Sequence, residues 1–366
     1  MNTTEHTRTL LWWGNSDINY SRNRICRQAM QAMGYRIVDF RPWARWGVQW
    51  QASMHRLGKP DLVWVPCFRQ RDISAARAWA TRHQVPLLVD PLISAWDKQV
   101  FERAKFAPDS VQARRLKIWE SGLLQSADIV LADTDLHARL FADELGVAPE
   151  RLFTVHVGAE ESLFQPRPRN RTTSTIEVLF YGSFIGLHGV ETIIQAARLA
   201  KGQPNIIWTL LGEGPQKPGC MELAKGHDNI RFESAIPYNE LPQRIANADI
   251  LLGVFGGSAK AGNVIPNKVF QALACGKPVI TRISNTYPQK ESPEANAGLA
   301  LIAPDNPNAL LNAVMAWAAN PATFPARGEA ARTYYDANFS QQHIQTQLET
   351  AIQSLASHPA IRHATP

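Results

Sequence analysis

Short apolar runs that read as β-strands alternate with segments of helical period along most of this 366-residue chain. A strand, a helix and a further strand form the usual crossover between parallel strands. Repeated many times, this pattern predicts an α/β fold with doubly wound parallel sheets and helices on both faces. The strand-like runs are Thr9–Trp13, Arg36–Asp39, Leu62–Pro66, Leu87–Val89, Ile129–Ala132, Phe153–Val157, Glu177–Tyr181, Ile206–Leu211, Ile230–Glu233, Ile250–Val254, Val279–Thr281 and Ala300–Ile302.

The chain is too long for one ordinary hydrophobic core, so two domains are expected. The segment QPRPRNRTTS (165–174) is rich in Pro and Arg and lies between two complete αβ series. We therefore expect an N-terminal Rossmann-like domain at 1–164, a linker at 165–174 and a C-terminal domain at 175–341. A last helix at about 342–358 packs either on its own domain or back on the first one.

Composition limits where the protein acts. No apolar run reaches the roughly 18 residues of a membrane span, and the N-terminus lacks a signal-peptide pattern. The scattered cysteines Cys26, Cys67, Cys220 and Cys275 fit a reducing compartment, so a cytoplasmic location is expected. The ten histidines form no metal-binding spacing, and we expect no metal, no cofactor and no nucleic-acid partner.

Positive charge is concentrated in the first third of the chain. Residues 1–120 hold 19 Lys and Arg against 10 Asp and Glu, together with nine of the eleven tryptophans. This combination indicates an anionic partner, either a membrane surface or an anionic substrate, or else a solvated basic face over a Trp-rich core. The segment Lys98–Trp119 mixes basic and aromatic residues in the same way, and both interpretations remain open there.

The stretch GVFGGSAKAGNVIPNKVFQALACGKPVIT (253–281) indicates a site for a phosphorylated ligand. An apolar strand runs into a glycine-rich loop, and a helix begins near Asn267. Unpaired N–H groups and the peptide dipoles at a helix N-terminus favour an anion, and Lys260 and Lys268 add positive charge. The competing interpretation of Lys268 is an exposed helix lysine.

Several motifs, in order and spacing, resemble one known family. They are SADIVLADT (126–134), HVGAEESLFQP (156–166), VLFYGSFIGLHGVETIIQAARLA (178–200), LLGEGP (210–215) and VIPNKVFQALACGKPVIT (264–281). From about Asp90 onward the chain resembles the GT4-type retaining glycosyltransferases of the GT-B fold. The resemblance implies two Rossmann-like domains that face an interdomain cleft, with the donor held by the C-terminal domain and the acceptor by the N-terminal one.

The resemblance also implies an activity. It is the transfer of a sugar, of hexosyltransferase type and with retention, from a nucleotide-diphosphate sugar to an acceptor hydroxyl. The acceptor is expected to be a saccharide or a lipid-linked molecule in cell-surface polysaccharide or glycolipid synthesis, with the protein at the inner face of the cytoplasmic membrane. Two alternatives remain: a non-catalytic subunit of the same fold that binds a sugar or a partner transferase, and a nucleotide-sugar 2-epimerase.

The chain departs from the family pattern at several positions. Two glutamates eight residues apart are common in the family, and Asn263 and Gln271 occupy the corresponding positions of this chain. Ser183 and His188 replace an Arg and a Lys that hold the diphosphate in relatives, so Lys260 and Lys268 are expected to supply that charge. Leu92 stands where a histidine is common.

The resemblance assigns candidate roles, although the glycines also suit tight turns and the aspartates also suit caps. The expected catalytic residues are Asp90, Lys260 and Lys268. The expected acceptor-side residues are Tyr20, Ser21, Arg22, Asn23 and Asp97. The expected donor-binding residues are Gly182, Ser183, His188, Gly189, Gly212, Gly214, Ile236, Pro237, Gly256, Gly257, Ser258, Asn263, Val264, Ile265, Asn267 and Gln271.

Overall fold

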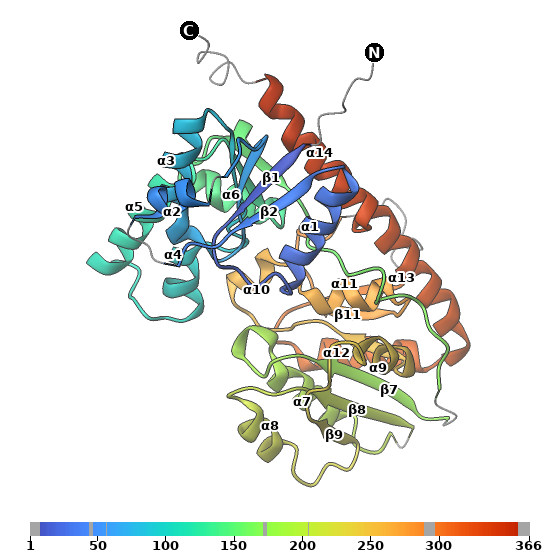
Figure 1. Cartoon of the computed structure of the whole chain (residues 1–366). Coiled ribbons are helices and arrows are strands. Elements are labelled where there is room, and N and C mark those ends of the chain that lie inside the picture. The colour runs from blue at the N-terminus through green and yellow to red at the C-terminus, as the bar shows by residue number, and fades with distance from the viewer. Residues whose placement is uncertain are drawn as a thin grey trace, which may run out of the picture. The chain divides into compact units, whose positions relative to one another are not determined.

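Two compact units make up the protein, whose structure is a computed structural model that describes residues 8–43, 47–55, 57–170, 174–203, 205–288 and 297–357. Unit 1 comprises Met1–Val157 together with Gln341–Pro366, and unit 2 comprises Gly158–Ser340. The expected linker at 165–174 thus falls inside unit 2, and its residues 171–173 lie outside the described residues. Figure 1 labels the elements of both units.

Unit 1 contains a sheet of six parallel strands in the order β2-β1-β3-β4-β5-β6. Its strands are β1 (Thr9–Trp13), β2 (Arg36–Phe40), β3 (Leu62–Val65), β4 (Leu87–Val89), β5 (Ile129–Ala132) and β6 (Leu152–Thr154). Its longer helices are α1 (Ser21–Ala32), α2 (Val48–Met54), α3 (Ile73–His83), α5 (Val111–Gln125), α6 (Asp135–Asp143) and α14 (Gln341–Ser357), with the short α4 (Ala95–Asp97) and η2 (Lys98–Glu102) after β4.

Alternate residues of β1 point into two different cores, as the two-residue period of a strand requires. Leu10 belongs to a core that also contains Ile25 of α1 and Ile344 of α14. Leu11 belongs to the opposite core, which contains Trp79 of α3. The last helix of the chain therefore packs against α1 in unit 1, as Figure 1 shows.

Unit 2 contains a second sheet of six parallel strands, in the order β12-β11-β10-β7-β8-β9. Its strands are β7 (Ile176–Tyr181), β8 (Ile206–Leu211), β9 (Ile230–Glu233), β10 (Ile250–Leu252), β11 (Val279–Arg282) and β12 (Leu299–Ile302). Its α-helices are α7 (Val190–Leu199), α8 (Lys217–Leu223), α9 (Leu241–Asn247), α10 (Ala259–Asn263), α11 (Asn267–Ala274), α12 (Pro307–Ala318) and α13 (Phe324–Asn338), and its short 3-10 helices are η4 (Gly186–His188) and η6 (Pro321–Thr323).

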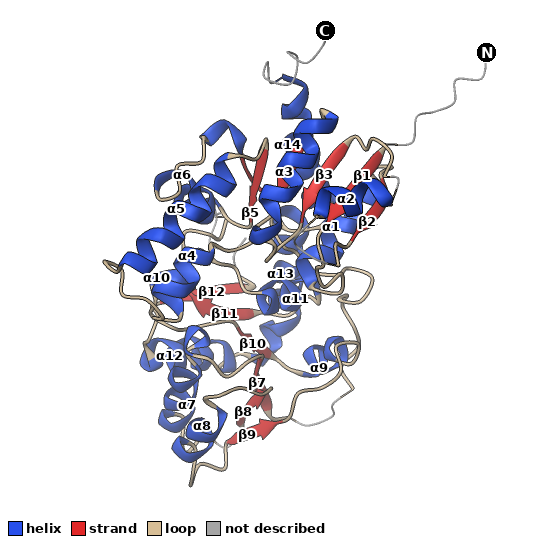
Figure 2. Ribbon diagram, turned by 60° about the vertical axis from the view of Figure 1, so that its left-hand side comes forward, coloured by secondary structure: helices blue, strands red, loops and turns tan. Residues whose placement is uncertain are grey.

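The central strand β7 is buried along its whole length, which explains its continuous apolar sequence. Val178 and Phe180 pack with Ile193 of α7 and Leu310 of α12. Figure 2 shows α7 and α12 on one side of the sheet and α11 and α13 on the other, which is the doubly wound arrangement. The predicted α/β class with parallel sheets is confirmed for both units.

Two strand ends, those of β10 and β6, differ from the prediction by more than one residue. β10 ends at Leu252 because Gly253 bends the chain beneath Thr281, whose hydroxyl accepts a hydrogen bond from the Val254 N–H at 3.2 Å. β6 ends at Thr154, where the chain leaves the sheet towards unit 2. No helix in the described part of the chain is both long and apolar enough to cross a membrane.

Candidate functional site

Three loops meet at the carboxyl edge of the sheet in unit 2. They follow β7 (182–189), β8 (212–214) and β10 (253–258). The Phe184 N–H donates to the Glu213 carbonyl at 2.9 Å, and the Phe255 N–H donates to the His188 carbonyl at 3.0 Å. Ligands of open α/β sheets bind at this edge, so the sequence-predicted loops lie where a donor site is expected.

Glycine lets these loops come close enough to touch through their backbones. At Gly212, with φ +136°, an added Cβ would lie 2.0 Å from the Gly182 carbonyl oxygen. At Gly189, with φ +62°, it would lie 2.5 Å from the Gly256 nitrogen. No L side chain fits such distances, so the predicted glycines build the floor of the candidate site by contact with one another. An added Cβ at Gly214 would likewise meet the backbone of Phe184, and one at Gly257 would meet the Asp305 carboxylate.

Lys268 is the central cation of this edge. It lies in the first turn of α11, is only 7% exposed, and its Nζ makes no hydrogen bond within the described residues. The ammonium group lies 3.9 Å from the centroid of the Phe180 ring and borders Gly182. Burial lowers the pKa of Lys268 well below its ordinary value, because water is excluded and no acceptor replaces it.

Lys268, Phe180, Gly182 and His188 lie together and form the Lys268 cluster. His188 adds no positive charge to it. Its Nδ1–H donates to the Ser183 carbonyl, and its ring contacts Phe180 with 5.9 Å between centroids. Burial, together with the charge of Lys268, lowers the pKa of His188 to about 3. The ring is therefore neutral at pH 7 and leaves Nε2 as an acceptor.

Gln271 lies one helical turn after Lys268 and is buried, with 6% exposed. The Tyr181 hydroxyl donates to the Lys268 carbonyl at 2.8 Å and to Gln271 Oε1 at 3.3 Å. Burial raises the pKa of Tyr181 well above its ordinary value, so the hydroxyl remains a donor. Tyr181 thus fixes the predicted ribose-binding side chain, a role that the sequence did not reveal.

The glycine-rich loop continues into the short helix α10. Ser258 caps this helix by accepting the Ala261 N–H at 3.2 Å, and Lys260 within it is 5% exposed. Asn263 and Val264 close α10, and Asn267 opens α11 after the buried Ile265.

Arg282 was not among the site residues predicted from the sequence. It ends β11 and donates from Nη1 to the Ser258 carbonyl at 2.8 Å and to the Gly256 carbonyl at 2.5 Å. It thereby holds the loop whose backbone borders Gly189. An arginine directly after the apolar strand 279–281 was the available signal.

Ile236 and Pro237 follow β9, which lies two strands from β7 in the sheet order. They share the carboxyl edge with Gly212 but take no part in the Lys268 cluster. Ile236 is half-buried and Pro237 is exposed.

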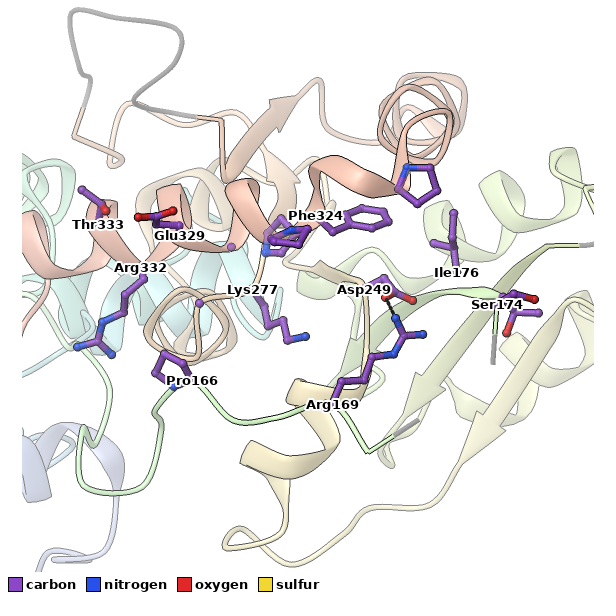
Figure 3. A pocket seen from close by; sticks show the side chains of 16 residues that line it. Pro166, Arg169, Ser174, Ile176, Asp249, Lys277, Phe324, Glu329, Arg332 and Thr333 are labelled. Atoms are coloured by element: carbon purple, nitrogen blue, oxygen red, sulfur yellow. Dashed lines mark hydrogen bonds and ion pairs between the residues drawn. The ribbon is translucent and has the colours of Figure 1, made fainter. Parts of the chain in front are cut away.

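A separate pocket of about 650 Å³ lies at the opposite edge of the same sheet (Figure 3). It is lined where β7, β10 and β11 begin, by Ile176, Asp249 and Pro278. Arg169 Nη1 pairs with Asp249 there at 2.7 Å. None of the predicted donor residues lines this pocket, so it is distinct from the Lys268 cluster.

In unit 1, Asp90 and Arg22 are brought together below the surface. Arg22 is fully buried and Asp90 is 1% exposed, and Nε lies 2.8 Å from Oδ2. Arg22 Nη1 also donates to the carbonyls of Val155 and His156 at 2.5 and 3.0 Å. Burial alone would lower the pKa of Arg22, but the Asp90 carboxylate raises it above its ordinary range. This placement makes Asp90 an internal partner of α1.

The remaining residues of the loop before α1 are largely enclosed. Asn23 is 2% exposed, donates to the Asp17 carbonyl at 2.8 Å and accepts from the Cys67 thiol at 3.1 Å. Tyr20 is half-buried and packs edge-on against Phe68. Burial raises the pKa of Tyr20 to about 12. Ser21, half-buried, opens α1.

Asp97 lies in α4 and is 6% exposed; its N–H donates to Ser94 Oγ at 3.0 Å. A residue that the sequence did not reveal holds this turn. Glu120 of α5 is fully buried and accepts from Ser94 Oγ at 2.7 Å, Ala95 N–H at 2.6 Å and Trp96 N–H at 2.8 Å. The carboxylate thus caps the start of α4 and fixes the loop after β4.

Comparison with known proteins covers both units. The family "Glycosyl transferases group 1" matches residues 175–320, and "Glycosyl transferase 4-like domain" matches residues 24–158. The putative colanic acid biosynthesis glycosyltransferase WcaL of Escherichia coli (strain K12) is 24% identical over 239 residues, which are 64% of this chain. The match spans 58% of the length of that relative.

Solved structures share the fold at low sequence identity. Anabaena Alr3699/HepE, solved in complex with UDP, superposes with a TM-score of 0.68 at 13% identity, covering 96% of this chain and 100% of that one. Sucrose-phosphate synthase from Thermosynechococcus elongatus gives 0.69 at 18% identity, covering 96% and 99%. The chain therefore belongs to the group 1, GT4-like family of glycosyltransferases and has the GT-B fold.

Proposed function

We propose that this protein transfers a sugar from a nucleotide-diphosphate donor to an acceptor hydroxyl, with retention of configuration. In this proposal unit 2 binds the donor and unit 1 binds the acceptor. The observation that carries the proposal is the buried ammonium group of Lys268, which meets a glycine loop and no hydrogen-bond acceptor in the described residues.

A buried cation without an acceptor is unfavourable in the unliganded protein. A diphosphate group would supply the missing acceptor and the missing negative charge at once. The start of α11 adds to this preference, because no side chain caps it and its first N–H groups suit an anion. Ionisable groups whose pKa is strongly perturbed by burial often mark functional sites.

Charge development explains how the arrangement would promote transfer. As the bond from sugar to diphosphate breaks, negative charge grows on the leaving group. In our proposal Lys268 and Lys260 offset that charge, and the neutral Nε2 of His188 accepts a hydrogen bond from the donor or the acceptor. Gln271, held by Tyr181, is the proposed ribose contact. Asp90, paired with Arg22, acts by positioning α1 and not by contact with substrate.

The relatives suggest finer detail. HepE has been solved with UDP-glucose, and WcaL is named for colanic acid synthesis. We propose a UDP-sugar as donor and a saccharide or lipid-linked acceptor in cell-surface polysaccharide synthesis. The four cysteines are free thiols, which supports a cytoplasmic site of action, and the basic first unit is consistent with work at the membrane surface.

Titration calorimetry with UDP and a turnover assay test the proposal together. The assay follows release of UDP from a panel of UDP-sugars in the presence of acceptor extract. We expect binding and acceptor-dependent release, both weakened in Lys268→Met and unchanged in Lys201→Met, which alters an exposed lysine in the turn after α7. Equal UDP affinity in both variants and the wild type would refute the donor assignment.

One observation favours a second candidate. The amides Asn263 and Gln271 replace the glutamates of relatives, and Gln271 is already held by Tyr181. A subunit that binds UDP-sugars without transfer would keep the Lys268-dependent affinity and release no UDP with any acceptor. That result would favour the non-catalytic function.

A further inference from the structure

Unit 1 contains a pocket of about 1260 Å³ whose lining is strongly cationic. It lies at the carboxyl edge of the sheet, because its residues follow β3 and β4 and extend onto α5. Among the described residues that line it there is no Asp or Glu. Its cations are Arg69, Arg71, Arg103, Lys105 and Arg115.

Most of this positive charge is not neutralised locally. Arg69 pairs with Asp72. The other four cations form no ion pair with a carboxylate in the part of the chain that the structure describes. Lys105 instead lies over the Phe106 ring, 5.5 Å from its centroid. Like charges that converge on one cavity repel each other, so the pocket attracts a multivalent anion.

Apolar side chains border the same pocket and remain exposed. Phe68 and Trp119 line it with 43% and 38% exposed. Two further exposed apolar side chains do not line the pocket: Ile118, which precedes Trp119, is 73% exposed, and Phe101, in η2 with the lining residue Gln99, is 50% exposed. A soluble anion such as inorganic diphosphate would use the arginines and leave these side chains in water. An amphiphile with an anionic head would cover both.

We propose that this pocket binds the phosphate or diphosphate head of an amphiphilic acceptor, with the adjoining apolar chain against Phe68 and Trp119. The inference rests on the proposed function, since it names the acceptor class of the transferase. Arginine suits this head because its planar group donates two parallel hydrogen bonds to phosphate oxygens. The buried Glu120, which caps α4, holds the turn that precedes the pocket residue Gln99.

Farnesyl diphosphate is the probe, and inorganic diphosphate is the matched head without the chain. Binding is followed by calorimetry on the full chain. We expect farnesyl diphosphate to bind and inorganic diphosphate to bind roughly tenfold more weakly, because it lacks the apolar contacts. Equal affinities for the two probes, or no affinity for farnesyl diphosphate, would overturn the proposal.

Two neighbouring arginines of α5 provide matched variants. Arg115 lines the pocket, whereas Arg114 is exposed and outside it. Arg115→Gln should weaken farnesyl diphosphate binding roughly tenfold, the loss expected for a charged hydrogen bond, and Arg114→Gln should not. Equal weakening in both would show general charge attraction and refute a defined site. Thermal melts check that both variants fold.

Two further measurements separate the sources of failure. The UDP affinity of Arg114→Gln and Arg115→Gln should equal that of the wild type. If the wild-type protein does not bind UDP at all, the result would count against the donor site and not against this pocket. Vesicles of phosphatidylcholine with and without phosphatidic acid test a membrane surface as the occupant. Sedimentation with the acidic vesicles that depends equally on Arg114 and Arg115 would assign the charge to a surface and overturn the pocket.

Discussion

The ammonium group of Lys268 lies 3.9 Å from the centroid of the Phe180 ring, so that a lysine of α11 contacts the penultimate residue of the central strand β7. An aromatic face offers a cation partial compensation, but it offers no hydrogen-bond acceptor. The pairing holds the ammonium group beside Gly182, where our proposal places the diphosphate of the donor.

Replacement of Lys268 by methionine should separate stability from function. The apolar side chain removes a buried charge, so the free energy of unfolding should rise by about 1–2 kcal/mol. UDP affinity should fall at least roughly tenfold, because a hydrogen bond to a charged group contributes about 1.5 kcal/mol or more. Urea unfolding and calorimetry measure the two effects. A destabilised variant with unchanged affinity would contradict the assignment.

UDP binding should take up protons. Burial lowers the pKa of Lys268, so the folded, unliganded protein binds fewer protons there than the unfolded chain does. A diphosphate beside the ammonium raises that pKa again. Between the lowered and the ordinary pKa, affinity should therefore fall as pH rises, while stability without ligand should rise with pH.

Calorimetry in buffers of different ionisation enthalpy measures this uptake. Lys268→Met should abolish it. Burial also lowers the pKa of His188 to about 3, so a bound diphosphate could raise this pKa as well. Proton uptake that persists in Lys268→Met would therefore be assigned to His188.

The pair of Arg22 and Asp90 should be among the most sensitive points of unit 1. Asp90→Asn leaves Arg22 charged and buried, which should cost about 3–5 kcal/mol. Asp39→Asn is the matched control, because Asp39 pairs with Arg27 of the same helix but is 35% exposed; its cost should stay below about 1 kcal/mol. Similar shifts of the urea midpoint in both variants would show that Arg22 finds other compensation.

Gly212→Ala should disturb the backbone contact between Gly212 and Gly182 that forms part of the floor of the candidate donor site. Its Cβ would lie 2.0 Å from the Gly182 carbonyl, so unfolding free energy should fall by more than about 2 kcal/mol and UDP affinity should drop. Gly202 also has positive φ, +94°, but open space around it. Gly202→Ala should therefore cost only about 1 kcal/mol of backbone strain, with UDP affinity unchanged.

The sequence predicted the sheets well because a buried parallel strand leaves a strong signal. β8 (Ile206–Leu211) is a continuous apolar run between polar segments, and its bounds agree with those expected. The start of the helix α11 (Asn267–Ala274) was also predicted near its observed position, where Pro266 directly precedes the helix. Such local signals need no knowledge of partners far along the chain.

Pairings across the fold could not be predicted in the same way. Sequence analysis assigned Arg22 to the acceptor side and Asp90 to catalysis, but it did not predict that these residues, 68 positions apart, form a buried pair. Glu120 directly follows the basic segment Lys98–Trp119 in sequence, and only the fold shows that it caps α4. Side chains that act through long-range contacts carry no local pattern.

The assignment of α14 to unit 1 bears on the order in which the chain folds during synthesis. Ile344 and Leu348 complete the core beneath β1, although they leave the ribosome after every residue of unit 2. Domains usually fold from the N-terminus as they emerge. Here the inserted unit 2 is continuous in sequence and can finish first, while the nascent unit 1 keeps an uncovered apolar face. We expect that face to remain exposed to solvent until the last helix has been synthesised.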